Sequence, residues 1–203
     1  MRRDYFEGMY AANPDPWGFE TRWYEQRKYA LTLAALTRAH YGSVFEPGCS
    51  IGVLSAELAR RCDRLLSCDL VDVAVVQARA RLDALPGDHA ATQVRQWDAH
   101  DDWPAGVVDL VVVSEMLYYL DADDAAAFMR RAADHLADSG EIVLVHWRQR
   151  VPEYPLTGDE AHEIACATSG LVVVGHYDDD DLRLDVLARP GSPTVADRES
   201  LRD

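Results

Sequence analysis

The stretch VFEPGCSIGVLSAELA, residues 44–59, decides the fold. It predicts a short strand at Val44–Glu46, a loop that carries Gly48 and Gly52, and a helix at Leu54–Arg60. The two glycines allow a tight turn and a close approach of the backbone to a ligand. The helix that follows directs its free N–H groups back at this loop. The stretch therefore predicts the first strand–helix unit of an α/β fold, with a ligand bound at its turn.

An acidic residue ends the second predicted strand, Leu65–Asp69. The carboxyl ends of parallel strands meet at one edge of a sheet, where doubly wound folds bind their ligands. Asp69 can accept hydrogen bonds there from both hydroxyls of a ribose. A glycine loop with such a distal carboxylate indicates a ligand that contains adenosine. The alternative, in which the glycines only make a tight strand–helix turn, stays open.

The glycine loop favours S-adenosylmethionine over NAD as that ligand. A dinucleotide loop reads GxGxxG, whereas here Ser50 replaces the second glycine and Gly52 is out of place for the third. S-adenosylmethionine carries no phosphate, so its loop need not cradle an anion. The Glu46 carboxylate would repel a pyrophosphate but suits a sulfonium and an ammonium group. We therefore expect S-adenosylmethionine as cofactor.

The rest of the chain continues the alternation of strands and helices. Further strands are expected at residues 91–97, 108–114, 141–147, 171–175 and 182–189, and further helices at residues 73–85, 121–136 and from Thr157 to near Gly170, the last begun by a capping box with Glu160. This order implies a parallel sheet with helices on both faces. The short acidic turn at 178–181 makes the last two strands an antiparallel hairpin, and is better read as a solvated turn than as a metal site.

The N-terminal segment is rich in aromatic residues and precedes the alternation. Prolines at positions 14 and 16 argue against a regular helix in Met1–Glu20, and a helix is expected at Trp23–His40. We divide the chain into an N-terminal lid and helix (1–40), a core (41–189) and a disordered tail (190–203).

Composition narrows the classes of partner. The chain has 203 residues, 35 acidic and 20 basic, and a formal charge of -15. Such a surface repels phosphate backbones, so no nucleic-acid partner is expected. No apolar run is long enough for a membrane span, and the four cysteines have no metal-site spacing, so we expect a cytoplasmic protein without a metal. The oligomeric state stays open.

Four segments resemble the nodulation protein S family of methyltransferases. They are DPWG at 15–18 with YEQRKY at 24–29, the glycine loop EPGCSIG at 46–52, SEMLYYL at 114–120 and YPLTGDEAH at 154–162. The resemblance runs from about Asp15 to Arg189. It implies a class I methyltransferase fold, a Rossmann-like three-layer sandwich whose seven-stranded, mostly parallel sheet has one antiparallel strand. It also implies N-methylation, in the family's named members of the free amine of a deacetylated chitooligosaccharide.

We assign site residues from their places after strands and in the family-like segments. The cofactor is expected to contact Arg27, Glu46, Gly48, Cys49, Ser50, Gly52, Asp69, Leu70, Trp97, Asp98, Ala99 and Ser114. The acceptor, a small molecule such as a sugar amine, is expected to contact Trp17, Trp23, Tyr24 and Tyr119. Candidate catalytic residues are Glu115, Tyr118 and His146, any of which could relay the proton of an amine.

Each assignment has a structural alternative, and the function has others. Trp97 and the N-terminal aromatics could be ordinary packing, and His146 a structural histidine at a strand end. The glycine loop does not separate N- from O-methylation of a small natural product. A S-adenosylmethionine-binding module without catalysis is a further alternative, and the missing GxGxxG weighs against a nicotinamide-dependent oxidoreductase.

Overall fold

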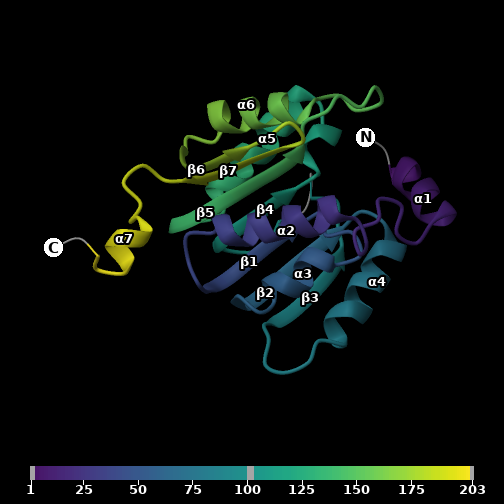
Figure 1. The fold of residues 1–203 in the computed structure, drawn as a ribbon, viewed down its shortest axis with the longest axis horizontal. Helices are drawn as coiled ribbons and strands as arrows, with labels where there is room; N and C mark the ends of the chain where they lie inside the picture. Colours follow the sequence, from purple (N-terminus) through teal and green to yellow (C-terminus); the bar gives the residue numbers. More distant parts are fainter. Residues whose placement is uncertain (1–2, 100–102, 202–203) are drawn as a thin grey trace.

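The computed structural model describes residues 3–99 and 103–201, which form one seven-stranded sheet between two layers of helices (Figure 1). The strand order is β3-β2-β1-β4-β5-β7-β6. In chain order the strands are β1 (Tyr41–Pro47), β2 (Cys62–Asp69), β3 (Ala91–Gln96), β4 (Val108–Ser114), β5 (Leu136–Trp147), β6 (Val172–Asp178) and β7 (Leu182–Ala188). Only β7 runs antiparallel to the other six strands. The strand order reverses between β1 and β4, which confirms the predicted doubly wound sheet.

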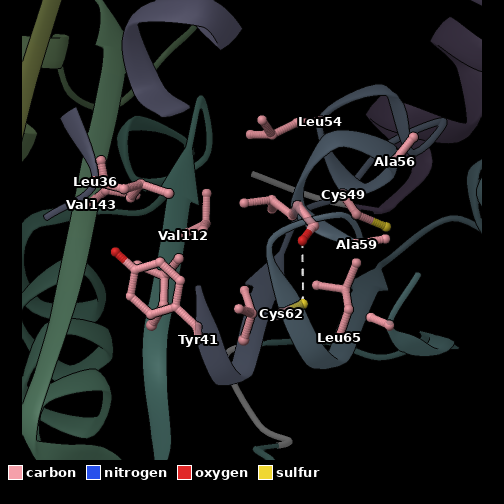
Figure 2. Packing of buried hydrophobic residues seen from close by; sticks show 14 of the residues in the cluster. Leu36, Tyr41, Cys49, Leu54, Ala56, Ala59, Cys62, Leu65, Val112 and Val143 are labelled. Carbon is pink, nitrogen blue, oxygen red and sulfur yellow. Dashed lines mark hydrogen bonds between the residues drawn. The ribbon is translucent and has the colours of Figure 1, made fainter. Parts of the chain in front are cut away.

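Alternating side chains of the central strands build two separate cores. In β4, Leu110 and Val112 face one hydrophobic cluster, and Val111 and Val113 face the other. Successive side chains of a strand point to opposite faces, so an unbroken apolar run requires cover on both. The first cluster lies under α2 (Trp23–Ala35), α3 (Val53–Leu58) and α4 (Asp72–Asp83), and Figure 2 shows it from close by. The second lies under α5 (Ala122–Asp134) and α6 (Gly158–Thr168).

The N-terminal segment forms a helix that the prolines had argued against. Helix α1 spans Arg3–Ala12 and ends before Pro14, so the prolines end the helix rather than prevent it. Its Tyr10 packs in a third cluster with Ile51, Val71 and Ala74. This cluster fixes α1 beside the loop after β1 and the start of α4.

Several element ends differ from the prediction. Helix α2 stops at Ala35, because Leu36 takes an extended backbone and turns the chain toward β1. Strand β5 begins at Leu136, within the stretch predicted as the end of a helix, and includes Gly140. At Gly140 a Cβ atom would approach the Asp109 carbonyl oxygen to 3.0 Å, so close pairing with β4 explains this glycine.

The C-terminal part follows the prediction in its helix start and hairpin. Thr157 and Glu160 form the expected capping box at the start of α6, and β6 and β7 pair as an antiparallel hairpin. Residues 190–201, expected to be disordered, contain the one-turn helix α7 (Val195–Arg198) in the structure, and Arg198 donates a hydrogen bond to the Thr37 hydroxyl. Among the described residues, no helix has the length and apolar character that crossing a bilayer requires.

Candidate active site

A cavity of about 620 Å³ opens at the carboxyl edge of the sheet, around the point where the strand order reverses. Its size suits a nucleoside-sized ligand together with part of a second molecule. Its wall includes most of the predicted site residues: Trp17, Tyr24, Glu46, Gly48, Cys49, Ser50, Asp69, Leu70, Trp97, Asp98, Ala99, Ser114, Glu115, Tyr118 and Tyr119. Segments far apart in the sequence thus meet at one site.

Asp69 at the end of β2 is fixed by the glycine loop that it faces. Its Oδ2 atom accepts a hydrogen bond from the Ser50 backbone N–H at 2.9 Å, and its Oδ1 atom accepts one from Val71 at 3.0 Å. Burial raises the pKa of Asp69, and the backbone donors act against that rise. Each oxygen keeps a second lone pair, so the carboxylate can still accept hydrogen bonds from a ligand in the cavity.

Glu46 at the end of β1 is buried under the same loop. Its Oε2 atom accepts hydrogen bonds from the hydroxyls of Ser55 at 2.5 Å and Ser67 at 2.8 Å. Burial raises the pKa of Glu46 to about 7, although both serine hydroxyls lower it. Near neutral pH this cavity carboxyl is therefore divided between its charged and neutral forms.

Glu115, directly after β4, is held by four hydrogen-bond donors. Its Oε1 atom accepts from the Tyr24 hydroxyl at 3.1 Å and from Lys28 Nζ at 3.0 Å. Its Oε2 atom accepts from the Tyr118 hydroxyl at 2.6 Å and from the Trp147 backbone N–H at 2.9 Å. Burial acts to raise the pKa of Glu115, but the Lys28 charge and the donors outweigh it and lower the pKa. Glu115 is thus an ionised carboxylate and a weak base.

Lys28 is the basic residue of the YEQRKY segment that reaches the cavity, in place of the predicted Arg27. The Lys28 side chain is 1% exposed, with Nζ 2.7 Å from Glu25 and 3.0 Å from Glu115. Arg27 lies outside the cavity wall and pairs with Asp179 at 2.7 Å. Adjacent helical residues point about 100° apart, so one step along α2 moves the charge to another face. The helical spacing of Tyr24 and Lys28 was the signal that could have identified Lys28.

Two further residues expected at the site, Trp23 and Gly52, do not line the cavity. Trp23 begins α2, is 72% exposed and does not line the cavity. Gly52 is also absent from the wall: it has φ +76°, and a Cβ there would lie 2.9 Å from Ala78 of α4. This glycine therefore allows α3 and α4 to pack closely.

His146, predicted as a catalytic candidate, is fully buried in β5 and does not line the cavity. Its Nε2 atom lies 3.1 Å from the backbone N–H of Leu117, and its Nδ1 atom lies 3.0 Å from His162 Nε2. Burial lowers the pKa of His146 well below the usual value. Both ring nitrogens have protein partners, so His146 cannot exchange a proton directly with an acceptor in the cavity.

Aromatic rings form the outer wall of the cavity. Phe6 of α1 packs edge-on against Tyr119, with ring centroids 4.9 Å apart, and lies 6.4 Å from Trp17. The hydroxyls of Tyr119 and Tyr154 are 3.2 Å apart. Sequence reasoning missed Phe6 and Tyr154 as wall residues, although Tyr154 begins one of the family-like segments.

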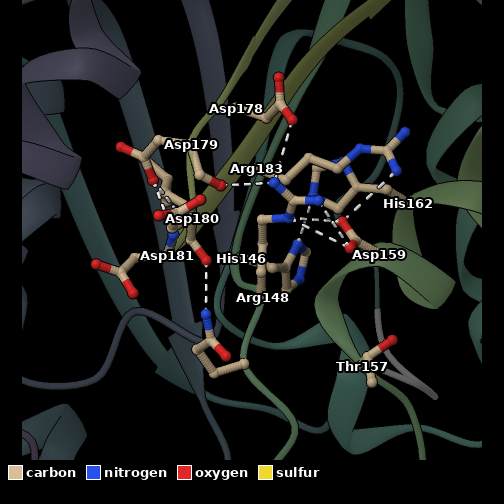
Figure 3. A network of polar contacts seen from close by, with 12 residues as sticks. His146, Arg148, Thr157, Asp159, His162, Asp178, Asp179, Asp180, Asp181 and Arg183 are labelled. Carbon is tan, nitrogen blue, oxygen red and sulfur yellow. Dashed lines mark hydrogen bonds and ion pairs between the residues drawn. The ribbon is translucent and has the colours of Figure 1, made fainter.

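In the acidic turn that joins β6 to β7, the carboxylates of Asp178 and Asp179 have protein partners. Asp179 accepts hydrogen bonds from the backbone N–H groups of Asp181 and Leu182, and Arg148 pairs with Asp178 and Asp159 (Figure 3). No group of three or more potential metal ligands occurs among residues 3–99 and 103–201.

A family model of the nodulation protein S family matches residues 3–171, which is more than three quarters of the chain. The chain belongs to the nodulation protein S family. The curated nodulation protein S of Sinorhizobium fredii NGR234 is 32% identical over 139 residues, a match that covers 65% of this chain and 60% of that protein. The three curated relatives are matched over 55–65% of their own length, so the similarity leaves a large part of each uncovered.

Solved structures extend the match to nearly the whole fold of this family member. A candidate methyltransferase from Pseudomonas syringae is 41% identical, with a TM-score of 0.70, over 83% of this chain and all of that one. The nodulation protein S N-methyltransferase of Bradyrhizobium japonicum WM9, solved with S-adenosylhomocysteine, has a TM-score of 0.81 at 24% identity, over 93% of this chain and 98% of that one. The predicted family and the class I methyltransferase fold are both confirmed.

Proposed function

We propose that this protein is a S-adenosylmethionine-dependent methyltransferase that methylates an amine of a small molecule. One observation carries the proposal: in a member of this family, Asp69 and Glu46 flank the glycine loop in a cavity at the reversal of strand order. The Asp69 carboxylate, with a spare lone pair on each oxygen, suits the two hydroxyls of a ribose.

The residues of the cavity fit the three parts of this donor. Asp98 has the carboxylate that an adenine amino group requires, with Ala99 as its apolar neighbour. Gly48, with φ +72°, lets the backbone of the loop approach the amino-acid end closely. When bound, S-adenosylmethionine would supply an activated methyl group on a positively charged sulfur.

The chain's own charges favour an amine as acceptor. The carboxyl groups on the cavity wall, which include Glu25, Glu46, Asp69 and Glu115, outnumber its basic side chains, Arg22 and Lys28, and Lys28 is already paired with two of them. Such a wall attracts a protonated amine, and the aromatic rings beside it offer faces for a cation or a sugar. A hydroxyl acceptor gains less from this wall, which ranks O-methylation second.

We assign Glu115 an electrostatic and positioning role. Its four donors keep it charged, and in return it fixes the hydroxyls of Tyr24 and Tyr118 at the cavity. Alignment of the reacting atoms alone can lower the barrier of such a transfer by roughly 7–11 kcal/mol. Glu46, with a pKa of about 7, is the cavity carboxyl better suited to exchange a proton near neutral pH.

The acceptor class is tested by turnover. The purified protein is incubated with S-adenosylmethionine and a matched set: deacetylated chitooligosaccharides, their N-acetylated counterparts, simple amino sugars and small alkylamines. With free amines we expect S-adenosylhomocysteine and a product in which a methyl group replaces one N–H hydrogen, a net gain of CH2. We expect neither with the N-acetylated compounds. Methylation of the N-acetylated compounds at a hydroxyl would assign an O-methyltransferase. Tight S-adenosylhomocysteine binding without turnover on any acceptor would favour a non-catalytic binding module.

A further inference from the structure

A chain of buried polar side chains runs from β7 through α6 and β5 to the loop after β4. Asp185 Oδ2 lies 2.6 Å from His162 Nδ1, and His162 Nε2 lies 3.0 Å from His146 Nδ1. His146 Nε2 lies 3.1 Å from the Leu117 backbone N–H. The three side chains are at most 1% exposed, and Figure 3 shows the two histidines among neighbouring ion pairs. Burying these three polar side chains costs free energy, and the methyl-transfer proposal so far gives them no role.

The Leu117 backbone N–H, at one end of this row of hydrogen bonds, fixes the direction of each of them. The Leu117 N–H can only donate, so His146 Nε2 must be an acceptor without a proton. The proton of neutral His146 is then on Nδ1 and is donated to His162 Nε2. His162 in turn carries its proton on Nδ1 and donates it to the Asp185 carboxylate. The chain therefore requires both histidines to be neutral in the Nδ1–H tautomer.

This order excludes proton conduction into the cavity, because the chain ends on an amide that cannot accept or pass on a proton. What it fixes is the position of Leu117, the first residue of the short 3-10 helix Leu117–Tyr119. That helix follows Glu115, whose backbone is in the left-handed region with φ +52°. The Tyr118 ring packs edge-on against His146, with ring centroids 5.1 Å apart.

We propose that His146, His162 and Asp185 are positioning residues that hold Glu115 and Tyr118 in the geometry needed for methyl transfer. The proposal rests on the methyltransferase function proposed above, and deepens it by assigning the buried chain a part in the reaction. From outside, Tyr118 packs on His146, and Arg183 and His176 hydrogen-bond to Asp185. The charges of Lys28 and Asp159 act on His146 and His162, respectively.

Protonation of either histidine would reverse a donor and an acceptor. A proton on His146 Nε2 would face the Leu117 N–H, and a proton on His162 Nε2 would face the His146 N–H. Burial lowers the pKa of both rings, and Lys28 and Arg183 act in the same direction, whereas Asp185 acts against it. Positioning is thus expected to persist at neutral pH and to fail only in acid.

The hydrogen-bonded array from Asp185 to Leu117 can be tested without a methyl acceptor. Two-dimensional ¹H–¹⁵N spectra of the histidine rings report tautomer and charge. From pH 6 to 8 we expect both His146 and His162 to stay neutral with Nδ1–H. A His146 ring that carries its proton on Nε2, or that becomes doubly protonated between pH 6 and 8, would overturn the proposal whatever the enzyme's acceptor.

Two substitutions of His146 test whether the buried side chains affect methyl transfer. In His146→Leu the Leu117 N–H loses its acceptor, whereas in His146→Gln an amide oxygen can replace Nε2. We expect His146→Leu to bind S-adenosylhomocysteine within about twofold of wild type but to lose at least about tenfold in kcat, since small misplacements are costly. We expect His146→Gln to recover most of that loss.

Equal kcat values for folded His146→Leu and wild type, or an equal loss in both variants, would contradict the proposal. If His146→Leu does not fold, His162→Gln against His162→Leu applies the same comparison one step along the chain. His40→Gln, at an exposed histidine paired with Asp63, is the matched control and is expected to leave kcat unchanged. If the wild type methylates no acceptor, the proposed function fails. The histidine spectra still test the tautomers of His146 and His162 in that case.

Discussion

Three carboxyl groups at the ends of neighbouring strands share the same chemistry but differ in their surroundings. Glu46 is buried with two hydroxyl donors and has a raised pKa of about 7. Glu115 is held by a lysine and three other donors and has a lowered pKa. Asp69 has one backbone donor on each oxygen. Environment thus assigns each group a different task, as it does for paired carboxyls in many enzymes.

The raised pKa of Glu46 predicts that its ionisation destabilises the folded chain. The folded value of about 7 lies above the 4.5 of a solvated glutamate, so between these pH values the native state holds the extra proton. The unfolding free energy therefore falls as pH rises through this window, by roughly 3 kcal/mol from this group. Glu46→Gln cannot ionise, so its unfolding free energy should lack this decrease.

Urea unfolding at pH 5 and pH 8, on wild type and Glu46→Gln, measures the difference. Other titrating groups are common to both proteins and cancel. Exposed Glu7→Gln is the control and should follow wild type at both pH values. Parallel pH profiles of wild type and Glu46→Gln would show that the carboxyl titrates normally in the folded state.

Glu115→Gln should weaken both folding and catalysis. A glutamine can accept on one atom only, and its amide group would face two of the four donors. Loss of hydrogen bonds to a charged group costs roughly 1.5–3 kcal/mol of unfolding free energy. The exposed ion pair of Glu57 with Arg60 offers a matched control, because Glu57→Gln should change stability by less than about 1 kcal/mol. Denaturant unfolding that gives equal values for the two variants would contradict this view of the Glu115 network.

At the scale of elements, the turn from β1 to α3 depends on two different properties of glycine. Gly52 needs a left-handed backbone and also the space beside Ala78 of α4. Gly87 has nearly the same φ, +77°, but nothing within 4 Å of the position of a Cβ. Gly87→Ala thus measures the backbone cost alone, which is roughly 1–2 kcal/mol.

Gly52→Ala should cost clearly more than Gly87→Ala, because α4 must also move. Thermal and urea unfolding of the two variants give the comparison. The excess would report the close packing of α3 on α4. Equal destabilisation would mean that the contact with Ala78 relaxes freely, and would reopen a ligand-binding role for this glycine.

The central elements could be predicted from sequence because periodicity and turn residues coincide there. The apolar run of β4, the glycine loop and the Thr157 capping box each have a local cause. Helix α1 and the early start of β5 have none: α1 is held by Tyr10 in a tertiary cluster, and the start of β5 by pairing with β4. Such contacts cannot be read from neighbouring residues.

At the scale of the whole molecule, strand order brings most predicted site residues to one cavity. The predicted side chains that miss the cavity do so because of their direction. Arg27 and Trp23 lie on faces of α2 that turn away from the cavity, and His146 points into the second core. Sequence position predicts which element a residue occupies, whereas the packing of that element decides which face reaches the site.

The measurement that tests the central claim most directly is calorimetric binding of S-adenosylhomocysteine, with NAD as the competing ligand. We expect micromolar binding of S-adenosylhomocysteine and no binding of NAD, and an affinity for S-adenosylhomocysteine at least about tenfold weaker in Asp69→Ala. Asp72→Ala is the control and should keep wild-type affinity, because Asp72 lies three residues away at the exposed start of α4. Absence of S-adenosylhomocysteine binding to wild type, or binding unaffected by Asp69→Ala, would contradict the central claim.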